Sequence, residues 1–139
     1  MILKKPKVIK INPPFQFELT DDCYDDLVRD VGIMLLNHII QSNELITYGD
    51  LTKKISHPIN PRNLDHPLGC ISNACKENKL PLLSVMVVNK ETLRPGPGFF
   101  KYFYPELKQS EWDPKFFELY KQVKEFKEWN CVLNAFIDS

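Results

Sequence analysis

Four residues in the middle of the chain have side chains that commonly bind metal ions. They are His57, His66, Cys70 and Cys75. His66 and Cys70 are four residues apart, so a helix would place them on one face. Zinc sites use closely spaced cysteine pairs, however, and Cys75 falls in the apolar stripe of the same predicted helix. The sequence therefore predicts no metal site and no cofactor.

Other catalytic patterns are missing from the sequence. It has no glycine-rich phosphate loop, no HExxH or GxSxG motif and no paired carboxylates at catalytic spacing. A run of acids precedes and enters the first predicted helix: Asp21, Asp22, Asp25, Asp26 and Asp30. Helix capping and a solvated helix face account for this run. An unrecognised nuclease-like enzyme that uses His57, His66 and nearby acids remains a second alternative.

Composition narrows the class of protein. The 139 residues carry 18 basic and 18 acidic side chains, a formal net charge of zero, and 43% are hydrophobic. This apolar content excludes a disordered chain, and 11 prolines argue against a coiled coil. No apolar run reaches the roughly 18 residues that a membrane span needs, and the N-terminus does not resemble a signal peptide. We expect a cytoplasmic protein with reduced cysteines and no membrane partner.

Apolar periodicity and capping residues predict the elements that must position any site. A helix is expected at about 21–41, behind an N-cap at Thr20, and a short one from Tyr48 to about Ser56, behind Thr47. The remaining predictions are a helix over 65–78, a buried strand over 82–88, an irregular proline–glycine arm over 93–98 and a last helix over 114–137. The aromatic run 99–104 could stack bases, but is expected to pack in the core.

The order of these elements predicts the fold. Two helices followed by a strand and a basic glycine–proline arm is the order of a winged helix. We therefore expect an α+β fold in one domain, residues 1–139. Its winged-helix-like core would cover residues 44–98, between the N-terminal and C-terminal helices.

Four short motifs follow one another between Ile46 and Phe99. They read ITYGDLTKKI, NPR, HPLGCI and LPLLSVMVVNKETLRPGPG. The segment resembles the DNA-binding domain of the O6-alkylguanine-DNA alkyltransferases and their alkyltransferase-like relatives. In that family the arginine of a Pro-Arg motif fills the space of a flipped nucleotide, and the tyrosine of a TYG motif helps to hold its phosphate. The resemblance assigns these roles to Arg62 and Tyr48.

The reactive motif of that family is Pro-Cys-His-Arg-Val, and this chain departs from it. Counted back from Val87-Val88-Asn89, the cysteine position is occupied by Ser84, the histidine position by Val85 and the arginine position by Met86. Without a thiol and an activating imidazole at these positions, the family's alkyl transfer is excluded. Binding of an altered base without its repair would remain.

We therefore expect a non-catalytic nucleic-acid-binding protein, with DNA as partner and an altered or flipped base as a further ligand. The expected binding residues are Tyr48, Arg62, Asn63, Ser84, Asn89, Lys90 and Arg94. The first alternative is a protein-interaction module on the same frame, such as an immunity or anti-defence inhibitor that binds a basic protein partner. The neutral net charge and the acidic first helix favour that alternative.

Overall fold

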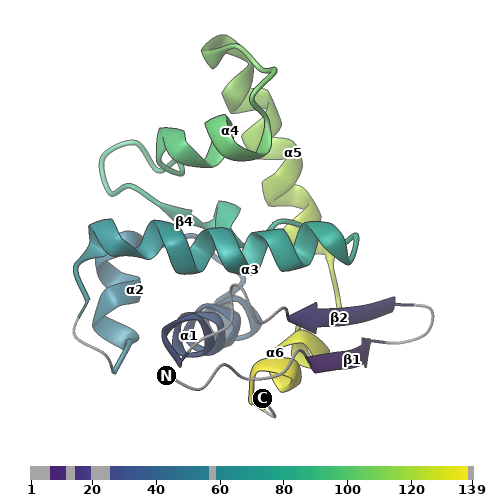
Figure 1. The fold of residues 1–139 in the computed structure, drawn as a ribbon. Coiled ribbons are helices and arrows are strands. Elements are labelled where there is room, and N and C mark those ends of the chain that lie inside the picture. Colours follow the sequence, from purple (N-terminus) through teal and green to yellow (C-terminus); the bar gives the residue numbers. More distant parts are fainter. Residues whose placement is uncertain (1–6, 12–14, 20–25, 57–58, 138–139) are drawn as a thin grey trace.

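The computed structural model describes residues 7–11, 15–19, 26–56 and 59–137 (Figure 1). Its strands are β1 (Lys7–Ile11), β2 (Phe15–Leu19), β3 (Ile46–Thr47) and β4 (Val87–Val88). Its α-helices are α1 (Asp26–Ser42), α2 (Tyr48–Lys54), α3 (Asp65–Glu77), α4 (Pro97–Phe103), α5 (Trp112–Glu125) and α6 (Trp129–Ile137). Short 3-10 helices are η1 (Pro61–Leu64), η2 (Leu83–Met86) and η3 (Gln109–Glu111). The described chain is mostly helical with two small sheets, an α+β fold.

The three predicted helices before residue 80 are present, and local capping explains their ends. Thr47 accepts a hydrogen bond from the backbone N–H of Asp50 at 3.1 Å, so α2 begins where predicted. Pro67 lies in the first turn of α3, where its missing N–H is tolerated. Asn43 closes α1 in the left-handed region, with a φ of 54°. The predicted start of the first helix, residues 20–25, lies outside the described residues.

The strand predicted over 82–88 is wrong for most of its length. Residues 83–86 form the 3-10 helix η2, and only Val87–Val88 pair as a strand, parallel to Ile46–Thr47. All seven residues from 82 to 88 are buried. Complete burial therefore explains the apolar run without an extended backbone, since an apolar run alone does not distinguish a strand from a buried turn.

The basic proline–glycine arm, which would be the wing of a winged helix, is part of a loop. It is closed by backbone hydrogen bonds from Leu93 N–H to the Asn89 carbonyl and from Asn89 N–H to the Arg94 carbonyl. Pro97 then occupies the first position of α4, so the irregular arm ends at Gly96 instead of Gly98. In Figure 1 this loop lies at the same left-hand end of the view as the start of α3.

The single helix predicted over 114–137 is two helices. Phe126, with a backbone φ of −70° and ψ of 130°, ends α5, and α6 begins at Trp129. The indole N–H of Trp129 donates to the Val123 carbonyl at 3.0 Å and holds the two helices at this corner. The apolar pattern continues across the corner because both helices contribute to one core.

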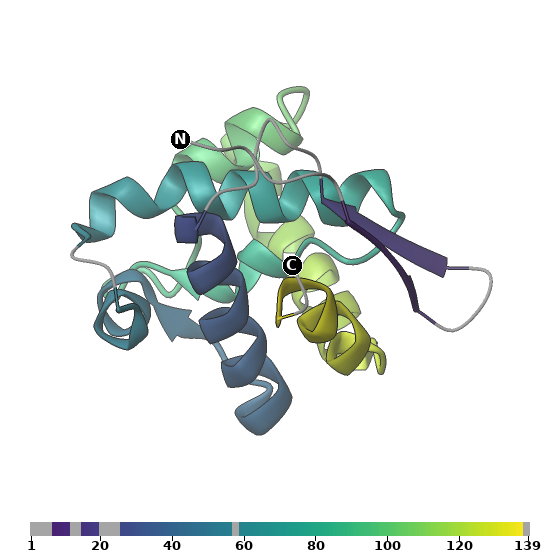
Figure 2. The same cartoon turned by 60° about the horizontal axis from the view of Figure 1, so that its bottom comes forward.

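The buried apolar side chains form one cluster that includes residues of α1, α3, η2, α5 and α6. Figure 2 shows α1 and α6 side by side, and the β1–β2 hairpin beyond α6. Gly32 permits this close packing, because a Cβ there would lie 2.6 Å from the Phe136 ring. Arg29 closes the end of α6 by donating to the carbonyls of Phe136 and Ile137. None of the helices described is both long and apolar enough to cross a membrane.

Candidate functional site: a cavity beside α3

A cavity of about 450 Å³ lies along α3, and polar and aromatic side chains meet around it. Its walls come from α3, α4, η2 and the start of α2. The lining residues are Tyr48, Asp65, His66, Gly69, Cys70, Asn73, Ser84, Gly98, Phe99, Tyr102 and Phe103. Two of these, Tyr48 and Ser84, are predicted binding residues. Tyr48 directly follows β3 and Ser84 belongs to η2, which leads into β4, so the β3–β4 pairing holds the two segments that carry them in one sheet.

Tyr48 is the first residue of α2, and its phenol is anchored at the cavity wall. The Tyr48 oxygen accepts a hydrogen bond from the backbone N–H of Gly96 at 3.0 Å. Burial raises the pKa of Tyr48 above 10.0 and outweighs the lowering by the Gly96 N–H, while the Asp65 carboxylate raises it further. Tyr48 is therefore a protonated phenol at neutral pH, with a hydrogen to donate.

Ser84 is 95% enclosed, with 5% of its surface exposed, and belongs to a buried hydroxyl pair. The Ser72 hydroxyl donates to the Ser84 Oγ at 2.6 Å and accepts from the Ser84 backbone N–H at 3.1 Å. This arrangement uses the Ser84 oxygen as an acceptor and leaves its own hydrogen for a group in the cavity. The Ser84 hydroxyl can therefore donate a hydrogen bond into the cavity.

His66 and Cys70 form a second polar pair in the cavity wall. The Cys70 Sγ lies 3.8 Å from the His66 Nε2, one helical turn away on α3. Among the residues that the structure describes, no three metal-ligating side chains come together. Cys70, Cys75 and Cys131 are thiols and take part in no disulfide of the described chain. His57 and Cys23 lie outside the described residues.

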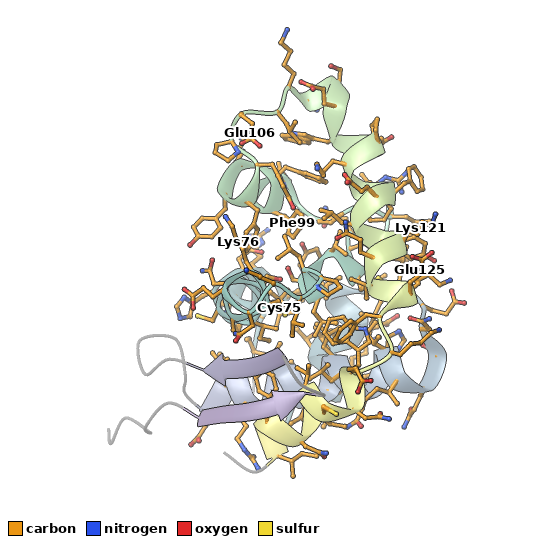
Figure 3. All side chains as sticks on the ribbon, turned by 90° about the vertical axis from the view of Figure 1, so that its right-hand side faces the viewer. Cys75, Lys76, Phe99, Glu106, Lys121 and Glu125 are labelled. Atoms are coloured by element: carbon orange, nitrogen blue, oxygen red, sulfur yellow. The ribbon has the colours of Figure 1, made fainter. Side chains whose placement is uncertain are left out.

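Aromatic rings of α4 form the opposite wall. The Phe99 and Phe103 ring centroids are 5.2 Å apart, and Tyr102 meets Phe103 edge to face at 4.8 Å. Asn73 of α3 donates to the Tyr102 hydroxyl at 2.9 Å, across the two helices. Figure 3 labels Phe99 on α4 and Cys75 on α3. This wall combines aromatic rings with the polar groups of Asn73 and Tyr102, a lining that suits a flat ligand.

Arg62 and Asn63 lie on η1, immediately before α3, and both side chains are exposed. The Asn60 side chain accepts from the Arg62 backbone N–H at 3.0 Å and sets the start of η1. Arg62 is therefore presented to solvent by the turn that leads into α3.

The three predicted residues after β4 have different surroundings. Lys90 is exposed, and Asn89 closes the loop with its backbone. Arg94 instead makes contacts within the protein: its Nε lies 2.9 Å from the Asp113 carboxylate, and its guanidinium lies 4.4 Å from the centroid of the Phe116 ring. Its predicted phosphate contact would compete with these contacts.

The sequence reasoning missed several members of the cavity. Asn73, Phe99 and Tyr102 are not among the predicted site residues. Cys70 was considered only as a metal ligand, and His66 as a metal ligand or as a residue of a nuclease-like enzyme. The four-residue spacing of His66 and Cys70 indicates that they share one face of a helix. Nothing in the sequence shows that α4 lies opposite that face.

Comparison of this chain with protein-family models, with curated proteins and with solved structures gives no significant match. The geometry of the cavity and the charges around it are thus the basis for assigning a function.

Proposed function

We propose that this protein is a non-catalytic DNA-binding protein of the winged-helix type. In this proposal α2 and α3 are the helix pair, α3 is the recognition helix, and the loop over residues 89–96 takes the place of the wing. The cavity beside α3 receives an altered or flipped base.

The observation that carries the proposal is the convergence of Tyr48 and Ser84 on one cavity, near an exposed arginine at the start of α3. The volume of about 450 Å³ falls in the range typical of small-ligand sites, roughly 300–1,000 Å³. Its aromatic wall suits the faces of a base, and the hydroxyls of Tyr48 and Ser84 suit the acceptors on its edge. Arg62, exposed on η1, would occupy the gap that the flipped base leaves.

Exposed cations near the helix pair support DNA as the partner. They are Lys53, Lys54, Arg62 and Lys90, of which Lys53 also lies 3.9 Å from the Asp50 carboxylate. Because the net charge of the chain is zero, this local group must supply the attraction to phosphates. We therefore expect modest affinity that falls as salt increases.

Fluorescence anisotropy with short duplexes tests the proposal. The probes are a plain duplex and one that contains O6-methylguanine, each at two salt concentrations. Arg62→Ala should weaken binding about tenfold, as expected for an inserted or base-contacting arginine. Lys127→Ala removes a positive charge from an exposed residue of the α5–α6 connection and should leave binding nearly unchanged. Absence of binding at low salt, or equal loss in both variants, would contradict the proposal.

The contacts of Arg94 favour one other function, a protein-interaction module. Its ion pair with Asp113 removes one cation from the surface available to phosphates. A neutral chain with an acidic residue at the start of α1 would suit a basic protein partner. Co-purification of a basic protein that persists in Arg62→Ala, together with no DNA binding, would support this alternative.

A further inference from the structure

Cys70 and His66 combine a nucleophile with a base in the wall of the cavity. The Cys70 Sγ and the His66 Nε2 are 3.8 Å apart, within hydrogen-bonding reach for sulfur. Both residues line the cavity, although only 5% of the Cys70 surface is exposed. A thiol beside an imidazole is the usual arrangement of an activated cysteine, because the imidazole accepts the thiol proton as sulfur attacks.

We propose that Cys70, with His66 as its base, is a covalent capture site for planar α,β-unsaturated carbonyl compounds. This inference does not depend on DNA binding.

The choice of electrophile follows from the other cavity residues. Phe99 and Tyr102 line the cavity with aromatic rings, against which a flat conjugated molecule can pack. The Ser84 hydroxyl, whose oxygen already accepts from Ser72, can donate its hydrogen to a carbonyl oxygen. Conjugate addition builds up negative charge on that oxygen, so a donor there stabilises the transition state.

The proposed step is an addition that balances without any leaving group. The thiol proton passes to the His66 Nε2 while the Cys70 Sγ forms a bond to the β-carbon. The π electrons of the C=C bond shift toward the carbonyl and give an enolate. The His66 imidazolium then returns the proton to the α-carbon, so that the product contains every atom of the thiol and of the electrophile.

Two other described thiols provide internal comparisons. Cys75, labelled in Figure 3, lies on the same helix but is fully enclosed, and burial raises its pKa to about 12. Cys131 donates toward the Glu128 carboxylate at 3.5 Å, and burial together with that carboxylate raises its pKa. Both should be poor nucleophiles, because the thiolate is the reactive form.

The experiment uses the folded full-length chain with Cys23→Ser as background, because Cys23 lies outside the described residues. N-ethylmaleimide is the conjugated carbonyl probe and iodoacetamide is the comparison electrophile. Adducts are located by peptide mass spectrometry over time. Cys70 should react with N-ethylmaleimide about tenfold or more faster than Cys131, as expected for a thiol with an adjacent base. Cys75 should react only on unfolding.

Two variants separate the role of each partner. His66→Gln should slow labelling of Cys70 by about a hundredfold, the lower end of the range for general-base assistance. His38→Gln is the matched control, because His38 is a histidine of α1 that bonds to the Glu44 carbonyl. Ser84→Ala should slow the reaction with N-ethylmaleimide more than the reaction with iodoacetamide. A preserved iodoacetamide rate also shows that this variant is folded.

The proposal is overturned if Cys131 reacts as fast as Cys70, or if His66→Gln and His38→Gln label at equal rates. It is also overturned if Ser84→Ala slows both electrophiles equally while circular dichroism shows a native fold. Because labelling uses no DNA, a failure to bind duplexes leaves this result intact, and the two proposals fail separately.

Discussion

The two sides of α3 differ in how completely they are packed. On one side Ile71 and Cys75 are fully buried in the core, and α3 contacts α1. On the other side His66, Cys70 and Asn73 line a cavity of about 450 Å³. The same helix thus stabilises the fold with one face and holds polar groups beside open volume with the other. Substitutions on the two sides should therefore differ in kind: loss of stability in the core and loss of binding or reactivity at the cavity.

The largest effect is expected in the closed core, at the α1–α6 contact. Phe136→Ala removes a fully buried ring and should lower the free energy of unfolding by about 3–5 kcal/mol. Phe117→Ala, at a ring that is 52% exposed, should cost less than about 1 kcal/mol. Urea denaturation measures both, and similar losses at the two positions would contradict the assignment of the core.

Gly32→Ala tests the close approach within that core. The added Cβ would lie 2.6 Å from the Phe136 ring, so the ring or the helices must shift, at about 1–3 kcal/mol. In a Phe136→Leu background the same change should cost less, because the ring atoms that meet the Cβ are gone. An unchanged penalty in this double-mutant cycle would show that Phe136 is not the cause.

Substitutions in the buried Ser72–Ser84 hydroxyl pair should show whether a residue at the cavity costs less stability than one in the closed core. Ser72→Ala leaves the Ser84 N–H without its acceptor and should cost about 1–3 kcal/mol. Ser84→Ala removes a side chain that lines open volume, so water in the cavity can satisfy the Ser72 hydroxyl, and the loss should be smaller. Chemical denaturation of both variants checks this order, and a larger loss in Ser84→Ala would reverse it.

The smallest effect concerns Tyr48 in alkaline solution. Burial raises the pKa of Tyr48 in the folded protein, so the folded state holds the phenol proton more tightly than the unfolded chain. This contribution is complete below the ordinary tyrosine pKa of 10.0 and is lost as the pH rises toward the pKa of the folded state. Unfolding curves from pH 9 to 11 should show a steeper loss of stability in the native protein than in Tyr48→Phe. Equal slopes would contradict the prediction.

The helices that local chemistry defines could be predicted from the sequence. Thr47 marks the start of α2 through its side chain, and Pro67 marks the first turn of α3. These signals act within one helical turn and depend little on the rest of the fold. The break at Phe126 carries no such signal, because no proline or glycine stands there and the apolar pattern continues.

The site was only partly predictable. Tyr48 and Ser84 were named from motif resemblance, and the structure places both in the cavity. The cavity itself depends on how α4 sits over α3, a tertiary arrangement that periodicity does not encode. Arg94 was predicted to bind nucleic acid because it is basic. Its contacts with Asp113 and Phe116, which are distant in the sequence, could not be predicted from that property.

The short parallel pairing of β3 with β4 has a consequence for the order of folding. It joins Ile46–Thr47 to Val87–Val88 and encloses α2, η1 and α3 in one long loop. Closing such a loop costs chain entropy before its contacts form, so the helices inside it can form earlier than the pairing. Since Tyr48 and Ser84 flank the two strands, the cavity is complete only after this closure. A ligand held there would oppose local opening, and amide hydrogen exchange at Val87 and Val88 would slow as the cavity fills.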